Sequence, residues 1–251
     1  KTLNRATDTT RQPGSTFKIL ASYSAALDAG GLTLASVQDD APYTYAGANG
    51  KSVSNYDKRY RGFTTLREAI TDSINIVTVK TLAQVGVSLG WQYVQEYGFT
   101  TVDSRDMNEA LALGGITQGV SNLELTAAYA AIANQGTYIK PKFYTKILDH
   151  DGNVLIDNTT PESHTVIKDT TAWLLTSAME DVMTSGTGTS AYFGSSMAQA
   201  GKSGTTTSSR DALFAGYTPY YTCAVWGGYD DNAMQKGSDT SYPKRIWKAV
   251  M

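Results

Sequence analysis

The sequence contains little cysteine and little histidine. Cys223 is the only cysteine, so no disulfide can form within the chain. It lies in the apolar string YTCAVW, which predicts a buried strand and a structural role for the thiol. His150 and His164, the only histidines, lack neighbours at metal-ligand spacing. These shortages argue against a disulfide scaffold, a zinc site and a histidine-dependent catalytic triad, and we expect neither a metal nor a cofactor.

An excess of one charge and a long apolar run are also missing. The 21 basic and 23 acidic residues give a net charge of −2, so the basic surface typical of nucleic-acid binding is not expected. No run approaches the roughly 18 apolar residues of a membrane-spanning helix. What remains is an ordinary globular composition, 41% hydrophobic and 18% charged, in 251 residues that suffice for a full core.

Cap, turn and periodicity signals predict helices first and strands last. Capping boxes or helical periodicity indicate helices at 15–29, 65–72, 75–84, 88–97, 123–136 and 169–183. A hairpin is predicted at 142–158, and strands are predicted at 198–207, 212–219 and 220–230. Short turns join these last strands, so the sheet should be antiparallel.

Residues 31–62 are rich in Gly, Tyr, Asn and Asp and are predicted to be irregular with short strands. Within this stretch, 41–62 either borders a cleft or forms a flexible surface loop, and the sequence leaves both readings open.

The string RQPGSTFKIL, residues 11–20, places Ser15 at the start of a helix and Lys18 one turn further on. A capping serine beside a solvated lysine would explain this string alone. Ser-x-x-Lys occurs a second time, at 241–244. There a proline precedes the lysine and no helical pattern spans the string, so we expect no active site at this second match.

Two further strings change the meaning of the first. Ser73-Ile74-Asn75 is the only Ser-x-Asn in the chain, and Lys202-Ser203-Gly204 is the only Lys-Ser/Thr-Gly. They follow Ser15 in a fixed order, with separations of 58 residues (73 − 15) and 129 residues (202 − 73). This ordered set is the signature of serine β-lactamases and penicillin-binding proteins.

The chain resembles the transpeptidase domain of bifunctional (class A) penicillin-binding proteins. The segments that carry the resemblance are spread over nearly the whole chain: NRATDTTRQPGSTFK, ALALGGITQGVSNLELTAAYAAIANQG, AGKSGTT, LFAGYTP, VWGGYDDN and WKAVM. Ser203 stands where many members have Thr, Leu213 where an aromatic is usual and Ile19 where Pro is common. None of these departures removes a reacting group.

The resemblance implies an α/β fold of the β-lactamase/transpeptidase type. Its central antiparallel sheet is flanked by helices, and a mainly helical subdomain carries the Ser-x-x-Lys and Ser-x-Asn motifs. We expect residues 1–251 to form one such domain, truncated at both ends. Two sheet strands, a glycosyltransferase domain and a membrane anchor would precede it. A sheet without those strands would have an uncovered edge and marginal stability.

The motif residues are suited to acyl transfer. A serine hydroxyl needs a base within reach, and positions i and i+3 of a helix share a face, so Lys18 can activate Ser15. Lys18 must be neutral to do so, which burial and a second cation, Lys202, would promote. Ser73 can relay a proton, and Asn75 can hold the substrate amide and orient Lys18.

The remaining roles concern substrate binding. The backbone N–H groups of Ser15 and Thr205 would form the oxyanion hole. The hydroxyls of Ser203 and Thr205 can bind the terminal carboxylate of a peptide ending in D-alanine. Gly204 would let the substrate backbone lie close to the strand.

The implied activity is a serine D,D-transpeptidase that cross-links peptidoglycan stem peptides ending in D-Ala-D-Ala and is inhibited by β-lactams. It would act on the extracytoplasmic face of the bacterial cell membrane, with membrane contact only through the upstream anchor. None of the six glutamates has Asn four residues later, which argues against a class A β-lactamase. A D,D-carboxypeptidase and a non-catalytic β-lactam sensor remain as alternatives.

Overall fold

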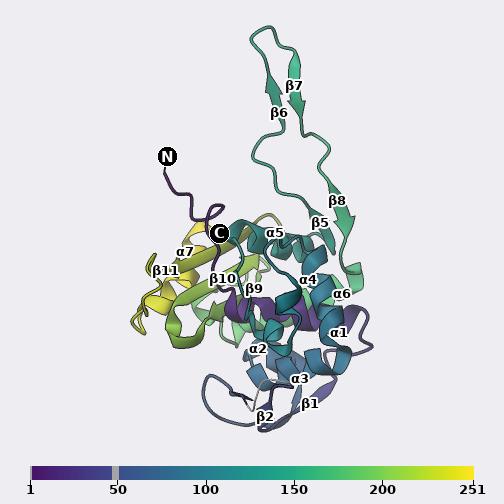
Figure 1. Ribbon diagram of the computed structural model, residues 1–251, viewed down its shortest axis with the longest axis vertical. Coiled ribbons are helices and arrows are strands. Elements are labelled where there is room, and N and C mark those ends of the chain that lie inside the picture. Colours follow the sequence, from purple (N-terminus) through teal and green to yellow (C-terminus); the bar gives the residue numbers. More distant parts are fainter. Residues whose placement is uncertain (1, 47–50) are drawn as a thin grey trace.

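The computed structural model describes residues 2–46 and 51–251. Its centre is a three-stranded antiparallel sheet in the order β11-β10-β9, beside a helical region at the lower end of Figure 1. The strands are β9 (Ala200–Thr205), β10 (Asp211–Tyr217) and β11 (Thr222–Gly228). The antiparallel arrangement and the strand positions predicted from the sequence are confirmed.

Three helices cover the sheet: α5 (Asn122–Ala133), α6 (Asp169–Thr184) and α7 (Tyr242–Val250). Alternation along β10 separates its two faces, because Leu213 belongs to the main core whereas Phe214 packs with Trp247 of α7. The prediction of a buried strand around Cys223 is wrong in its degree of burial: β11 lies at the edge of the described sheet and is half-buried along its length, and Cys223 packs half-buried beside this second cluster.

The helical region consists of α1 (Ser24–Asp28), α2 (Leu66–Thr71), α3 (Asn75–Val85), α4 (Val87–Glu96), η3 (Ser104–Asp106) and η4 (Glu109–Leu113). The predicted capping boxes at Thr65 and Ser121 are present, with Glu68 and Glu124 as their reciprocal partners. One hydrophobic core joins this region to the sheet, so the two parts are packed together.

The first predicted helix, 15–29, differs from expectation in its type. It begins as the 3₁₀ turn η1 (Gly14–Thr16), continues as the π-helix η2 (Lys18–Tyr23) and becomes α-helical only in α1. A π-helical segment inside a helix is rare and often marks a functional site.

Short strand pairs border the helical region. They are β1 (Val37–Asp40) with β4 (Gly62–Thr65), and β2 (Tyr43–Thr44) with β3 (Ser52–Val53). The predicted irregular stretch with short strands is thus confirmed where it is described, whereas residues 47–50 of that prediction lie outside the described residues.

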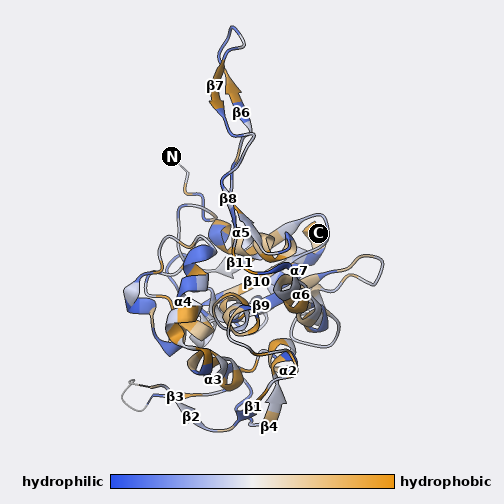
Figure 2. Cartoon of the chain, turned by 90° about the vertical axis from the view of Figure 1, so that its right-hand side faces the viewer, coloured by the Kyte–Doolittle hydropathy of each residue, from blue (hydrophilic) through white to orange (hydrophobic). Residues whose placement is uncertain are grey.

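The predicted hairpin projects far from the body (Figure 1). Its strands β6 (Lys146–Leu148) and β7 (Val154–Asp157) follow a stem made of β5 (Thr137–Ile139) and β8 (Ser163–Thr165). Figure 2 colours β6 and β7 as hydrophobic although they are clear of the body, and Leu155 is 64% exposed.

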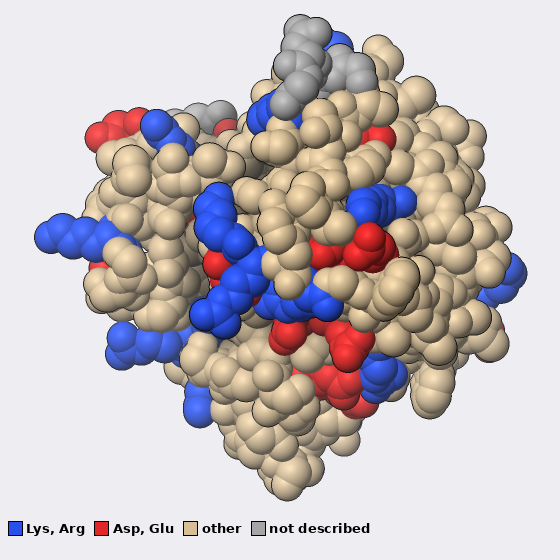
Figure 3. All heavy atoms as spheres, turned by 90° about the horizontal axis from the view of Figure 1, so that it is seen from below, with Lys and Arg blue, Asp and Glu red and all other residues tan. Residues whose placement is uncertain are grey.

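Side chains of both charges gather on the face of the molecule seen from below (Figure 3). On the underside, basic and acidic side chains lie next to one another in one band (Figure 3). The α2 and β4 end of the molecule carries the ion pairs Arg67–Asp181 and Arg61–Asp57. Within the described ranges, no helix has the length and apolar character needed to cross a membrane.

Candidate active site

The three sequence motifs meet at the hydroxyl of Ser73. Its Oγ lies 3.1 Å from Lys18 Nζ of η2 and 2.8 Å from Lys202 Nζ of β9. Ser73 occupies the turn between α2 and α3 and has a φ of 56°, a left-handed conformation that only a few per cent of non-glycine residues adopt. Residues far apart in the sequence thus form one lysine–serine–lysine row.

Asn75, the first residue of α3, fixes the position of Lys18. Its Oδ1 accepts a hydrogen bond from Lys18 Nζ at 2.6 Å, and its Nδ2 donates to the Ser54 carbonyl at 2.8 Å. The Ser73 carbonyl accepts from the same Lys18 Nζ at 2.6 Å. The orientation that sequence analysis assigned to Asn75 is therefore present in the structure.

Both lysines of the row are fully buried, and among the described residues neither forms an ion pair with a carboxylate. Burial, and then the nearby charge of Lys202, hold the pKa of Lys18 well below its usual value. Burial and the charge of Lys244 lower the pKa of Lys202 to about 7. Two unpaired buried ammonium groups side by side would be very unfavourable, so this environment favours the neutral form of Lys18.

Ser15 lies in η1 and lines the open cleft in front of this row. Gly14 places it there: its φ is +54°, and a Cβ at this position would lie 3.3 Å from the Thr205 backbone. The expected hydrogen bond between Lys18 and Ser15 is not formed among the described residues, because Lys18 Nζ contacts Ser73 and Asn75 instead. Catalytic hydrogen bonds are often formed only in the substrate complex.

Strand β9 presents its motif residues in different directions. Thr205 is exposed and lines the cleft, whereas Ser203 Oγ lies 2.8 Å from Thr187 Oγ1. A Cβ at Gly204 would lie 2.8 Å from the Pro13 carbonyl oxygen and 2.9 Å from Thr16 Cγ2. The missing side chain of Gly204 therefore allows β9 to pack against η1, a reason that differs from the substrate contact expected from the sequence.

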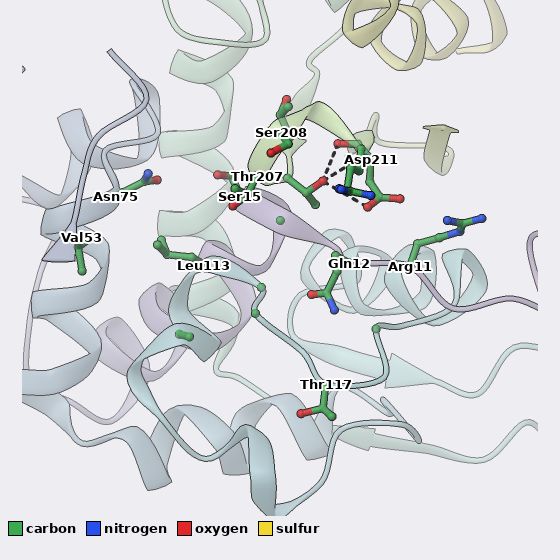
Figure 4. A pocket seen from close by; sticks show the side chains of 18 of the residues that line it. Arg11, Gln12, Ser15, Val53, Asn75, Leu113, Thr117, Thr207, Ser208 and Asp211 are labelled. Carbon is green, nitrogen blue, oxygen red and sulfur yellow. Dashed lines mark hydrogen bonds between the residues drawn. The ribbon is translucent and has the colours of Figure 1, made fainter. Parts of the chain in front are cut away.

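The cleft has a volume of about 770 Å³. Figure 4 shows Asn75 and Val53 on one side of Ser15, and Thr207, Ser208 and Asp211 on the other. The stretch that the sequence left open borders this cleft, because Tyr45 and residues 51–54 line it. In the sequence, only the clustered tyrosines and asparagines of residues 41–62 indicated that this stretch borders the cleft.

The prediction that no helix spans the second Ser-x-x-Lys string, residues 241–244, is wrong. Helix α7 begins at Tyr242, so the string is helical through Lys244 despite Pro243. Ser241 Oγ donates to the Ser238 carbonyl and is not among the described residues that line the cleft. Lys244, which sequence analysis gave no role, is half-buried and its Nζ donates to the Thr187 carbonyl at 3.3 Å.

Comparison with known proteins identifies the family. The model of the penicillin binding protein transpeptidase domain matches residues 1–251. Penicillin-binding protein 1F of Bacillus subtilis is 39% identical over 259 residues, covering 100% of this chain and 35% of that protein. Penicillin-binding protein 1A of Clostridium botulinum is 34% identical, covering 96% of this chain and 30% of that protein. The chain spans about a third of the length of these relatives.

Solved structures give the same result. Penicillin-binding protein 1A from Haemophilus influenzae superposes with a TM-score of 0.85 at 27% identity, covering 99% of this chain and 43% of that one. PonA1 from Mycobacterium tuberculosis, solved in complex with penicillin V, superposes with a TM-score of 0.86 at 25% identity. The match covers 100% of this chain and 70% of that one. A family match over the full sequence, with the three motifs brought together around Ser73, shows that the chain belongs to the penicillin-binding protein transpeptidase family.

Proposed function

We propose that this chain is a serine D,D-transpeptidase that cross-links peptidoglycan stem peptides ending in D-Ala-D-Ala and is acylated by β-lactams. The observation that supports this most is the position of Ser73 Oγ between the Nζ atoms of two buried lysines, behind a serine that lines an open cleft. That arrangement supplies a nucleophile, a base and a proton path without histidine.

In the acylation step, Lys18 releases one of its present hydrogen bonds and forms one with Ser15 instead. It then takes the proton of the Ser15 hydroxyl. Ser15 Oγ then bonds to the carbonyl carbon of the penultimate D-alanine, and backbone N–H groups of Ser15 and Thr205 stabilise the oxyanion. The C–N bond breaks, and Ser73 passes a proton from the lysine row to the departing D-alanine amine. In the second step the amine of another stem peptide attacks the acyl-serine and loses its proton along the same path.

The terminal carboxylate is assigned to Ser203 and Thr205, near the positive charge of Lys202. Thr205 is open to the cleft, and Ser203 reaches a ligand once its hydrogen bond to Thr187 is released. In a β-lactam the cleaved amide nitrogen stays tethered to the acyl group, so it remains near the cleft and hinders the second step. The site would act on the extracytoplasmic face of the cell membrane, where its polymeric substrate lies.

The test is intact-mass analysis of the chain during incubation with a penicillin, followed by mapping of the adduct. We expect a long-lived adduct on Ser15, no adduct for Ser15→Ala, and an unchanged adduct for Ser241→Ala. The last variant is a matched control, since Ser241 has the same Ser-x-x-Lys spacing and lies outside the lining of the cleft in the described structure.

Other outcomes would favour the alternative functions. An adduct lost within seconds would indicate a hydrolase, such as a carboxypeptidase. A stable adduct without aminolysis, when a thioester donor and a D-amino acid acceptor are added, would indicate a sensor. The absence of any adduct from folded protein would refute the assignment.

A further inference from the structure

Asn55 is a buried amide at the edge of the cleft that none of the three motifs contains. It is 1% exposed and lies directly after the cleft-lining residues Val53 and Ser54. Its Oδ1 accepts hydrogen bonds from the backbone N–H groups of Asn75, at 3.0 Å, and Ile76, at 3.2 Å. These are the first two residues of α3, whose own N-cap residue, Ile74, provides no side-chain cap. Asn55 therefore caps this helix from a distant segment.

The other end of the amide is fixed equally well. Asn55 Nδ2 donates to both carboxylate oxygens of Asp40, at 2.8 and 3.0 Å, and to the Arg59 carbonyl at 2.8 Å. Asp40 is fully buried in β1, and it also accepts from the Arg61 backbone N–H at 2.9 Å. Because every partner of Nδ2 is an acceptor and both partners of Oδ1 are donors, only one orientation of this amide satisfies the site.

This anchoring continues to the base of the reaction. With Asn55 held on α3, the preceding carbonyl of Ser54 lies 2.8 Å from Asn75 Nδ2. That contact turns Asn75 Oδ1 toward Lys18 Nζ, 2.6 Å away. The path from Asp40 through Asn55 and Asn75 to Lys18 is a chain of direct hydrogen bonds.

We propose that Asn55 and Asp40 are positioning residues for acylation: they lock the chain that follows the cleft-lining residues Val53 and Ser54 onto the start of α3 and thereby orient Asn75 and Lys18. The proposal rests on the proposed function, since it concerns the same acyl-serine chemistry. Neither residue touches the reacting atoms, so their effect passes through Asn75.

The experiment measures the rate of acylation of the full chain by a fluorescent penicillin as a function of pH. For Asn55→Ala we expect a rate at least about tenfold lower, because a misplaced base loses most of its effect. We also expect the acid limb of the profile to move to lower pH, since Lys18 loses an acceptor that stabilises its ammonium form.

Gln199→Ala is the matched control. Gln199 is a buried amide, 4% exposed, that bonds the backbone of Phe193 and Gly194 and is not among the described residues lining the cleft. This variant should lose stability with no shift of the profile. If Asn55→Ala reacts as fast as the unchanged chain, or more slowly with an unshifted profile, the positioning role is wrong.

A rescue variant covers the case in which Asn55→Ala does not fold. Asn55→Asp alone places two buried carboxylates together and should slow acylation, whereas Asn55→Asp with Asp40→Asn restores a donor–acceptor pair between the two side chains. Faster acylation by the double variant than by the single one supports the proposal, and no gain refutes it. Labelling of the unchanged chain on Ser15 in the same series tests the proposed function separately.

Discussion

Lys244 influences the active site through its charge. It lies on α7, which packs against β10 and β11, and its charge is the largest cause, after burial, of the lowered pKa of Lys202. The ammonium form of Lys202 donates a hydrogen bond to Ser73 on the proposed proton path, so acylation should decrease as the pH rises past about 7, where Lys202 loses its proton.

Lys244→Met should therefore move the alkaline limb of the acylation profile to higher pH. Removal of a neighbouring positive charge raises the pKa of Lys202, while the methionine preserves most of the apolar stem. Lys248→Met is the control, because Lys248 is exposed one turn further along α7. Equal shifts in both variants, or no shift in either, would show that Lys244 does not act on Lys202. The measurement is the acylation rate by penicillin over about two pH units on either side of 7.

At the residue scale, the sequence predicted which residues form the site better than it predicted the contacts between them. Lys18, Ser73, Asn75 and Lys202 were named from three short strings, and the structure brings all four together. The Lys18–Ser15 hydrogen bond was expected from an α-helical spacing, but the helix begins with 3₁₀ and π-helical turns. Asn55 was not predicted, because a buried amide that bonds backbone from a distant segment has no local sequence pattern.

At the element scale, the packing of β9 against η1 depends on Gly204. Gly204→Ala should lower the free energy of unfolding by about 1–3 kcal/mol, because its Cβ would overlap the Pro13 carbonyl and Thr16. Gly237→Ala is the control, since a Cβ there meets nothing within 4 Å and the backbone has no positive φ. Its change should stay within about 0.5 kcal/mol. The measurement is urea unfolding of both variants. Equal losses in the free energy of unfolding would mean that β9 moves away from η1 without a cost in stability.

The projecting hairpin should be dispensable for folding and for acylation. Every hydrogen bond of the described residues 142–159 joins two residues of that same segment. Its replacement by a short Gly-Ser link should change the free energy of unfolding by less than about 0.5 kcal/mol and leave the labelling rate unchanged.

Ile167→Ala is the contrasting variant, because Ile167 lies just after β8, at the base of the projecting hairpin. Ile167 is 1% exposed and belongs to the main core, so the loss should reach about 2–5 kcal/mol. A loss of similar size on replacing the hairpin would mean that its exposed apolar residues contribute to the core in solution.

Element positions were largely predictable because caps and periodicity are local. The capping boxes at Thr65 and Ser121 located two helices, and alternating strands separated by short turns gave the antiparallel sheet. Helix type was less accessible from the sequence, since every residue of the π-helix Lys18–Tyr23 is buried and no local pattern distinguishes it from an α-helix. The helicity of Lys244 was missed because proline is tolerated in the first turn of a helix.

At the scale of the whole molecule, buried ionisable groups in one shared core link function to stability. The core that joins the sheet to the helical region encloses Lys18 and Lys202 together with the buried tyrosines Tyr23, Tyr97, Tyr129 and Tyr217. Burial lowers the pKa of the lysines and raises the pKa of the tyrosines. These opposite shifts predict how the stability of the chain depends on pH.

The free energy of unfolding should rise from about pH 7 and fall again above about pH 10. Lys202 releases its proton at about 7 when folded and at 10.5 when unfolded, so the unfolded chain binds more protons in that interval and rising pH favours the folded state. Above 10.0 the unfolded chain loses tyrosine protons that the folded chain retains, which reverses the slope. Urea unfolding across this range should therefore show a maximum between these limits. Lys202→Met should reduce the rising part but not abolish it, because the pKa of Lys18 is lowered as well, whereas Lys248→Met should leave the rise unchanged. A free energy that falls steadily from pH 7 upward would contradict the lowered pKa values of Lys202 and Lys18, because buried lysines that kept their protons would produce no rising part.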